Sequence, residues 1–128
     1  MSSLSELIRG VDDRKLVLVP TPEWGSADGK IFAQRLSSVE RNELWEAQTE
    51  CRADAWGDFV PFIVARCARD SEGNRVFSDD ERTWLAADKS AVVVDRVFRA
   101  IDNLNLFSVR AEEEAKKNYA PTGDSAPT

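Results

Sequence analysis

The spacing of apolar residues between positions 90 and 105 restricts the fold more than any other feature of the sequence. These residues recur three and four positions apart: Val94, Val97, Phe98, Ile101 and Leu104. This period places side chains on one face of an α-helix. Asp88 or Ser90 is positioned to cap the helix. A chain of 128 residues supports a single hydrophobic core, so we expect this helix to lie at its centre.

A capping box predicts where an earlier helix begins. In this motif the serine oxygen accepts a hydrogen bond from the backbone amide of residue N3, and the glutamate carboxylate at N3 accepts one from the backbone amide of the cap residue. Ser37 and Glu40 have that spacing, and the helix is expected to run to about Cys51 with Leu44, Ala47 and Cys51 facing inward. A break at Gly57 and a cap at Asp58 then predict a second helix. It tolerates Pro61 in its first turn and turns four residues inward: Phe59, Phe62, Ile63 and Cys67.

A second capping box, Ser78 with Glu81, predicts a short helix that turns Trp84 and Leu85 inward. Between the two boxes, the acids of residues 70–74 lack the spacing of an EF-hand loop. We therefore interpret 70–75 as a turn and expect no metal site. Beyond the central helix we predict a charged helix over 109–117 and a disordered tail over 119–128.

The N-terminal third has a different pattern. Residues 16–19 are β-prone, a Pro-Thr-Pro bend follows, and an Asp-Gly turn precedes β-prone residues 30–36. Residues 16–36 are therefore predicted to form a hairpin. Residues 2–10 form either a short helix or a mobile arm. The expected fold is a mainly α-helical α+β single domain spanning 1–118, with a small N-terminal β-hairpin.

Composition excludes several classes of function. The chain has no histidine, which removes Ser-His-Asp and Cys-His catalysis and every histidine metal site. Its net charge of −6 argues against binding a nucleic-acid backbone. No apolar run is long enough to cross a membrane. We interpret Cys51 and Cys67 as reduced core residues rather than a disulfide, and expect no cofactor.

Tryptophan is abundant for a chain of this size, with four copies. Trp84 has the context of a core helix. Trp24 lies between a proline bend and a glycine turn, Trp45 borders the polar face of its helix, and Trp56 falls between two helices. Core packing is one interpretation of each of these three. Because large aromatic residues also dominate interface hot spots, we predict Trp24, Trp45 and Trp56 as partner-binding residues.

Several stretches together resemble a known family. The most specific has the form D-x-E-G-x-R-x-F-[ST]-D and reads Asp70-Ser71-Glu72-Gly73-Asn74-Arg75-Val76-Phe77-Ser78-Asp79. Shorter matches are Trp24-Gly25, Arg35-Leu36-Ser37, Glu40-Arg41, Lys89-Ser90, Asp95-Arg96-Val97-Phe98, Leu104-Asn105 and Lys117-Asn118. Over residues 16–118 the chain resembles the tail assembly chaperones of long-tailed double-stranded DNA bacteriophages.

The resemblance implies a non-enzymatic protein of the host cytoplasm. Such a protein binds the long helical tape measure protein, keeps it soluble and helps the major tail protein polymerise around it. It also suggests a homo-oligomer, with the hairpin edge as one route to association. In this family a ribosomal frameshift often appends a longer domain thought to recruit tail tube protein. Lys116-Lys117-Asn118 fits a slippery codon run and equally an ordinary basic helix end.

Two other classes of function remain as alternatives. An acidic inhibitor that mimics DNA and binds a host nucleic-acid-binding protein would need long rows of carboxylates. No acidic run here is longer than three residues, as in Glu112-Glu113-Glu114, so we rank this alternative below the chaperone. A small enzyme ranks third, because nearly every acidic residue falls on a predicted solvent face beside Arg or Lys.

Overall fold

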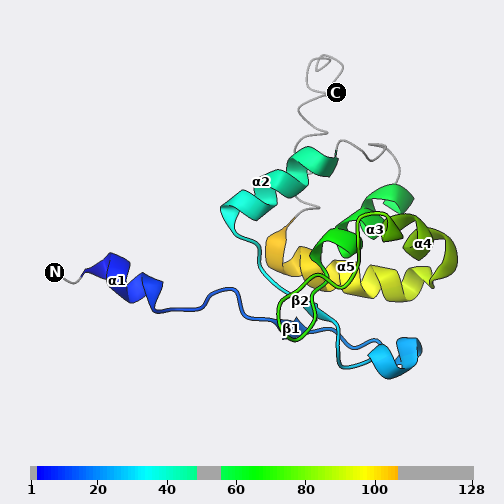
Figure 1. Ribbon diagram of the computed structural model, residues 1–128, viewed down its shortest axis with the longest axis horizontal. Helices are drawn as coiled ribbons and strands as arrows, with labels where there is room; N and C mark the ends of the chain where they lie inside the picture. Colours follow the sequence, from blue (N-terminus) through cyan, green and yellow to red (C-terminus); the bar gives the residue numbers. More distant parts are fainter. Residues whose placement is uncertain (1–2, 49–55, 107–128) are drawn as a thin grey trace, which may run out of the picture.

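The computed structural model describes residues 3–48 and 56–106, and of residues 56–58 it describes only the backbone. The fold is mainly helical α+β with one small antiparallel sheet, as predicted (Figure 1). Its elements in chain order are α1 (Leu4–Arg9), β1 (Val17–Leu18), the 3₁₀ helix η1 (Pro22–Ala27), β2 (Phe32–Ala33), α2 (Ser38–Ala47), α3 (Trp56–Cys67), α4 (Glu81–Asp88) and α5 (Ala91–Asn105). Cys51, the predicted helix over 109–117 and the predicted tail over 119–128 lie outside the described residues.

The core forms where α5 packs against α3, and α3 also packs against α4. Ser90 caps α5 by accepting the Val92 amide. Four of the five predicted core residues of this helix are buried, and Leu104 is half-buried. The rings of Phe59 and Phe98 meet edge to face, with centroids 6.1 Å apart. The predicted central helix is therefore confirmed.

Helix α3 begins earlier than the sequence predicted. It starts at Trp56, so Gly57 and Asp58 lie within the helix and Pro61 falls in its second turn. Proline at that position cannot donate a hydrogen bond to the Gly57 carbonyl oxygen. Burial explains why the helix tolerates this loss, because all residues from 59 to 65 are buried. The predicted inward residues, which include Cys67, are buried as expected.

The first predicted capping box is complete and the second is not. Ser37 Oγ accepts the Glu40 amide at 3.2 Å, and the Ser37 amide donates to Glu40 Oε1 at 2.9 Å. At α4 the Ser78 amide donates to Glu81 Oε1 at 2.8 Å. However, Asp80 occupies the N-cap position and makes no side-chain cap bond, so Ser78 as N-cap was wrong.

The inward orientation predicted for Trp84 was also wrong. Leu85 is buried, whereas Trp84 is 44% exposed. Neighbouring residues on a helix point about 100° apart. The single buried residue of α4 is Leu85, and this narrow contact with the core leaves Trp84 at the side of the helix.

The predicted hairpin is confirmed as an antiparallel pair with very short strands. Val17 pairs with Ala33, and Leu18 pairs with Phe32. Phe32 exchanges two backbone hydrogen bonds with Arg69, at 2.8 and 2.9 Å, so the chain after α3 extends the sheet. The connection between β1 and β2 is long enough to hold η1. This connection carries Trp24 toward the N-terminal half of α5, where Arg96 binds the neighbouring Glu23.

The side chain of Asn105 joins the last turn of α5 to the end of β2. Its Oδ1 accepts the Leu36 amide at 2.9 Å, and its Nδ2 donates to the carbonyl oxygens of Gln34 and Ile101. Asn105 is buried, and these three bonds satisfy it. They fix the hairpin against the core helix.

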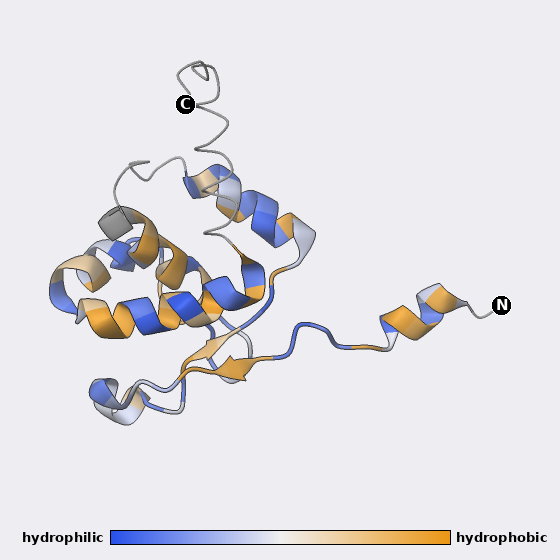
Figure 2. Ribbon diagram, turned by 180° about the vertical axis from the view of Figure 1, so that it is seen from behind, coloured by the Kyte–Doolittle hydropathy of each residue, from blue (hydrophilic) through white to orange (hydrophobic). Residues whose placement is uncertain are grey.

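Residues 3–13 form an arm that extends away from the helical body (Figure 1). Of the two alternatives left open by the sequence, a helix is present: α1 begins at the Ser3 cap and ends at Gly10. None of its residues is buried. Figure 2 shows apolar residues on this isolated helix, so the arm presents apolar surface to solvent.

Candidate partner-binding groove

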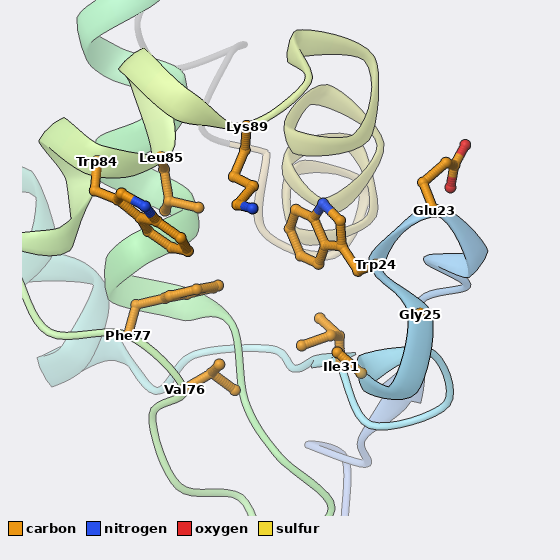
Figure 3. A pocket seen from close by; sticks show the side chains of 10 residues that line it. Glu23, Trp24, Gly25, Ile31, Val76, Phe77, Trp84, Leu85 and Lys89 are labelled. Carbon is orange, nitrogen blue, oxygen red and sulfur yellow. The ribbon is translucent and has the colours of Figure 1, made fainter.

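An open, mainly apolar groove of about 500 Å³ lies between η1, the segment before α4, and α4 itself (Figure 3). We call it the tryptophan groove. Its lining residues are Glu23, Trp24, Gly25, Ala27, Ile31, Val76, Phe77, Trp84, Leu85 and Lys89. Trp24 and Trp84 stand on opposite sides, with Phe77 and Ile31 below them. Its volume lies within the range of pockets that receive small ligands or clusters of side chains.

The first wall is η1, whose backbone presents Trp24. The Trp24 amide donates to the Thr21 carbonyl oxygen at 2.9 Å, and Gly25 kinks the chain with φ 61° and ψ −122°. A residue with a Cβ rarely adopts this conformation. The rings of Trp24 and Phe77 meet edge to face, with centroids 6.4 Å apart and planes at 81°. Trp24 is consequently half-buried, with part of its ring available in the groove.

Arg96 of α5 holds this wall in place. Its Nη1 and Nη2 donate to the two carboxylate oxygens of Glu23 at 2.6 and 2.8 Å. Its Nη1 also donates to the Pro20 carbonyl oxygen at 3.2 Å. The hydrogen bond from Arg96 lowers the pKa of Glu23 from its ordinary 4.5 to about 2. The clamp therefore joins residues 73 positions apart and is charged throughout the neutral pH range.

The second wall is built by the turn over residues 70–75. Asp70 Oδ1 accepts the amides of Glu72 and Asn74 at 2.8 and 3.0 Å. Gly73 has φ +85°, in the left-handed region that favours glycine. After the turn, the Val76 amide donates to the Ala68 carbonyl oxygen at 3.1 Å. The turn interpretation is thus confirmed, and the turn delivers Val76 and Phe77 to the groove.

Arg75 fastens the same segment to α3. Its Nη2 donates to the Ala65 carbonyl oxygen at 3.0 Å and to Asp79 Oδ1 at 2.7 Å, and Arg66 binds the other oxygen of Asp79 at 3.1 Å. The hydrogen bond from Arg75 holds the pKa of Asp79 below its usual range. Most residues of the motif that carries the family resemblance therefore have a role in the local structure. These residues are Asp70, Gly73, Arg75, Phe77 and Asp79.

The third wall is α4, where Trp84 and Lys89 meet. Lys89 Nζ lies 5.1 Å from the Trp84 ring centroid, within the range of a cation–π contact. Leu85 is buried below them. A partner side chain entering here would meet an exposed aromatic face, an apolar floor and one ammonium group. Such a surface suits an apolar segment better than a charged one.

The predicted partner-binding tryptophans do not lie together. Trp24 is in the tryptophan groove, whereas Trp45 is half-buried on α2 and does not line it. Trp56 begins α3, but its side chain lies outside the described residues. Sequence reasoning missed Trp84, Phe77 and Lys89 as groove residues. The adjacent pair Trp84-Leu85 was a usable signal, because a helix with a narrow buried face does not bury both.

The described residues offer few groups for metal binding or nucleophilic chemistry. Residues 3–48 and 56–106 contain no group of three His, Cys, Asp or Glu side chains placed to hold a metal ion. The Cys67 thiol is buried, which raises its pKa to about 12 and makes it unreactive. No helix in these ranges is both long enough and apolar enough to span a bilayer.

Comparison with known proteins gives no family assignment. A scan against protein-family models, a search of curated proteins and a search of solved structures each found no match.

Proposed function

We propose that the protein is a tail assembly chaperone that uses the tryptophan groove to bind an apolar helical stripe of the tape measure protein. The observation that carries the proposal is the open groove itself, in which Trp24, Phe77 and Trp84 present aromatic surface. Binding keeps the tape measure protein soluble until the major tail protein polymerises around it. The protein acts without catalysis or cofactor, in the host cytoplasm during virion assembly.

The chemistry of the groove supports a helical client. Amphipathic helices bind apolar grooves through residues spaced at i, i+3, i+4 and i+7. A tape measure protein carries long apolar helical stripes that are exposed before the tail tube covers them. The groove is a concave, mainly apolar space of about 500 Å³ whose charged lining residues are Lys89 and Glu23. Because Arg96 neutralises Glu23, a carboxylate on the client would meet Lys89 without repulsion from Glu23.

The charge pairing of the described residues supports the DNA-mimic alternative less than it supports the chaperone. Such a mimic would present rows of unpaired carboxylates at the spacing of phosphates. Here Glu23 binds Arg96, Glu40 binds Arg14, and Asp79 binds both Arg66 and Arg75. These pairs break up the negative surface.

Capture of the co-expressed tape measure protein tests the proposal. The full chain is expected to retain the tape measure protein in the soluble fraction. Trp24→Ala is expected to weaken capture, and an unchanged capture would contradict the groove as the binding site. Trp45→Ala is the comparison variant, because it removes the same side chain outside the groove. If Trp45→Ala alone weakens capture, the client binds at α2 instead.

The other proposed partners need a separate experiment. A longer product made by frameshifting would recruit the major tail protein, and the codons for residues 116–118 decide whether that product exists. Codons that interrupt the run of adenines, or the absence of an overlapping downstream frame, would remove this part of the proposal.

A further inference from the structure

The N-terminal arm, residues 3–13, carries an apolar stripe that the body of the protein does not cover. Leu4, Leu7, Ile8 and Val11 are 72%, 69%, 63% and 65% exposed. Leu4, Leu7 and Ile8 lie on α1 at positions i, i+3 and i+4, the spacing by which a helix anchors in an apolar groove. Val11 follows the helix, and its amide donates to the Ile8 carbonyl oxygen at 3.0 Å. The chain therefore carries both a helical stripe in need of cover and a groove suited to such a stripe.

We propose that the N-terminal arm of one copy docks in the tryptophan groove of a second copy, so that two chains exchange arms. The inference rests on the proposed function in one respect, that this groove is a docking surface. It adds that the arm of a second copy occupies the groove before a client binds. Because the exchange is reciprocal, each arm-to-groove contact is made twice in one dimer, and both apolar surfaces leave water.

Arg14 fixes the point from which the arm starts. Its Nη2 binds Glu40 Oε1 at 2.6 Å, and its Nε donates to the Arg35 carbonyl oxygen at 3.0 Å. Gln34 Nε2 donates to the Arg14 carbonyl oxygen at 2.7 Å. The base of the arm therefore belongs to the body, and only residues before Arg14 are free to reach a groove.

The course of the arm favours exchange over folding back. Val11, Asp12 and Asp13 line a hollow with Arg35 and with Leu104 of α5, and none of the arm residues lines the tryptophan groove of its own chain. Helix α1 extends to the opposite side of the body from η1, which forms one wall of the groove (Figure 1). An arm that keeps this course meets the groove of a second copy rather than its own.

The charges of the two surfaces are compatible with this contact. The arm has one basic residue, Arg9, and three acidic residues, Glu6, Asp12 and Asp13. Lys89 is the cation of the groove, and Glu23 is paired with Arg96. The acidic arm therefore approaches a groove in which the negative charge of Glu23 is already balanced by Arg96.

Sedimentation velocity of the full chain over a concentration series tests the exchange, with no tape measure protein present. The wild-type chain is expected to form a reversible dimer. Leu7→Asp, in the arm, and Trp84→Ala, in the groove, are each expected to raise the dimer Kd at least about tenfold, because each removes an apolar anchor. Ser5→Asp is the matched control, since it adds the same charge to α1 outside the apolar stripe and should leave the Kd unchanged.

Mixing the two defective variants provides a second readout. The Leu7→Asp chain keeps its groove and the Trp84→Ala chain keeps its arm, so together they should form a heterodimer that neither forms alone. A chain that is monomeric at every concentration would overturn the inference. So would a dimer that ignores both substitutions and is lost with Val17→Lys at the edge of β1. In either case, capture of tape measure protein by wild type but not by Trp24→Ala would leave the proposed function standing.

Discussion

Replacing Trp84 by alanine separates a core role for this residue from a binding role. A fully buried tryptophan costs about 3–5 kcal/mol when truncated to alanine. Trp84 is 44% exposed, so it buries roughly half of the ~200 Å² that a large aromatic residue buries in a core. At about 25 cal/mol per Å², this area is worth at most ~2.5 kcal/mol. Because unfolded chains also bury apolar surface, we expect the free energy of unfolding to fall by about 1–2 kcal/mol.

The expected effect on binding is at least as large as the effect on stability. Removing an aromatic anchor at an interface hot spot costs about 2 kcal/mol or more, which corresponds to roughly a 30-fold weaker Kd. Urea denaturation measures the first quantity, and titration with tape measure protein measures the second. Trp45→Ala is the control for both, because it removes a half-buried tryptophan outside the groove.

Two results would refute this reasoning. A loss of unfolding free energy above about 3 kcal/mol would make Trp84 a core residue, as the sequence first indicated. An unchanged Kd for tape measure protein would remove α4 from the binding surface, whatever the effect on stability.

Three further predictions concern the supports of the groove. Ile101→Ala should lower the free energy of unfolding by about 2–5 kcal/mol in urea, because Ile101 is fully buried between helices; a loss below 1 kcal/mol would contradict the core assignment. Gly73→Ala should lower the Tm through a cost of about 1–2 kcal/mol, since a φ of +85° strains a residue with a Cβ even in open space; an unchanged Tm would contradict the turn. The pKa of Glu23 is held at about 2, below its ordinary 4.5, by the hydrogen bond from Arg96. Its stabilising effect is thus complete above pH 4.5 and is lost as pH falls through 2. NMR titration should show this low pKa in wild type and a higher pKa in Arg96→Met, which removes the largest cause of the shift.

Local patterns in the sequence predicted the parts of the fold that depend on local physics. The spacing from Val94 to Leu104 identified the core helix, and Ser37 with Glu40 identified the start of α2. Each signal lies within a few turns of helix, where side-chain period and capping act directly. The turn over 70–75 was predictable for the same reason.

The groove depends on contacts that no local pattern contains. Arg96 meets Glu23 across 73 residues, and Asn105 meets the Leu36 amide across 69 residues. Which side of α4 faces solvent depends on how much of the helix α3 covers, and no local pattern shows this coverage. For that reason the sequence analysis wrongly assigned Trp84 to the core. Pro61 was placed in a first turn because a proline penalty is visible in sequence, whereas the burial that offsets it is not.

The most direct measurement for the proposed function is the NMR signal of each indole Nε1–H in the full chain during titration with tape measure protein. We predict that the Trp24 and Trp84 signals shift or broaden with the same saturation curve, while the Trp45 signal stays in place. Movement of the Trp45 signal with Trp24 and Trp84 unchanged would contradict a client-binding groove between η1 and α4.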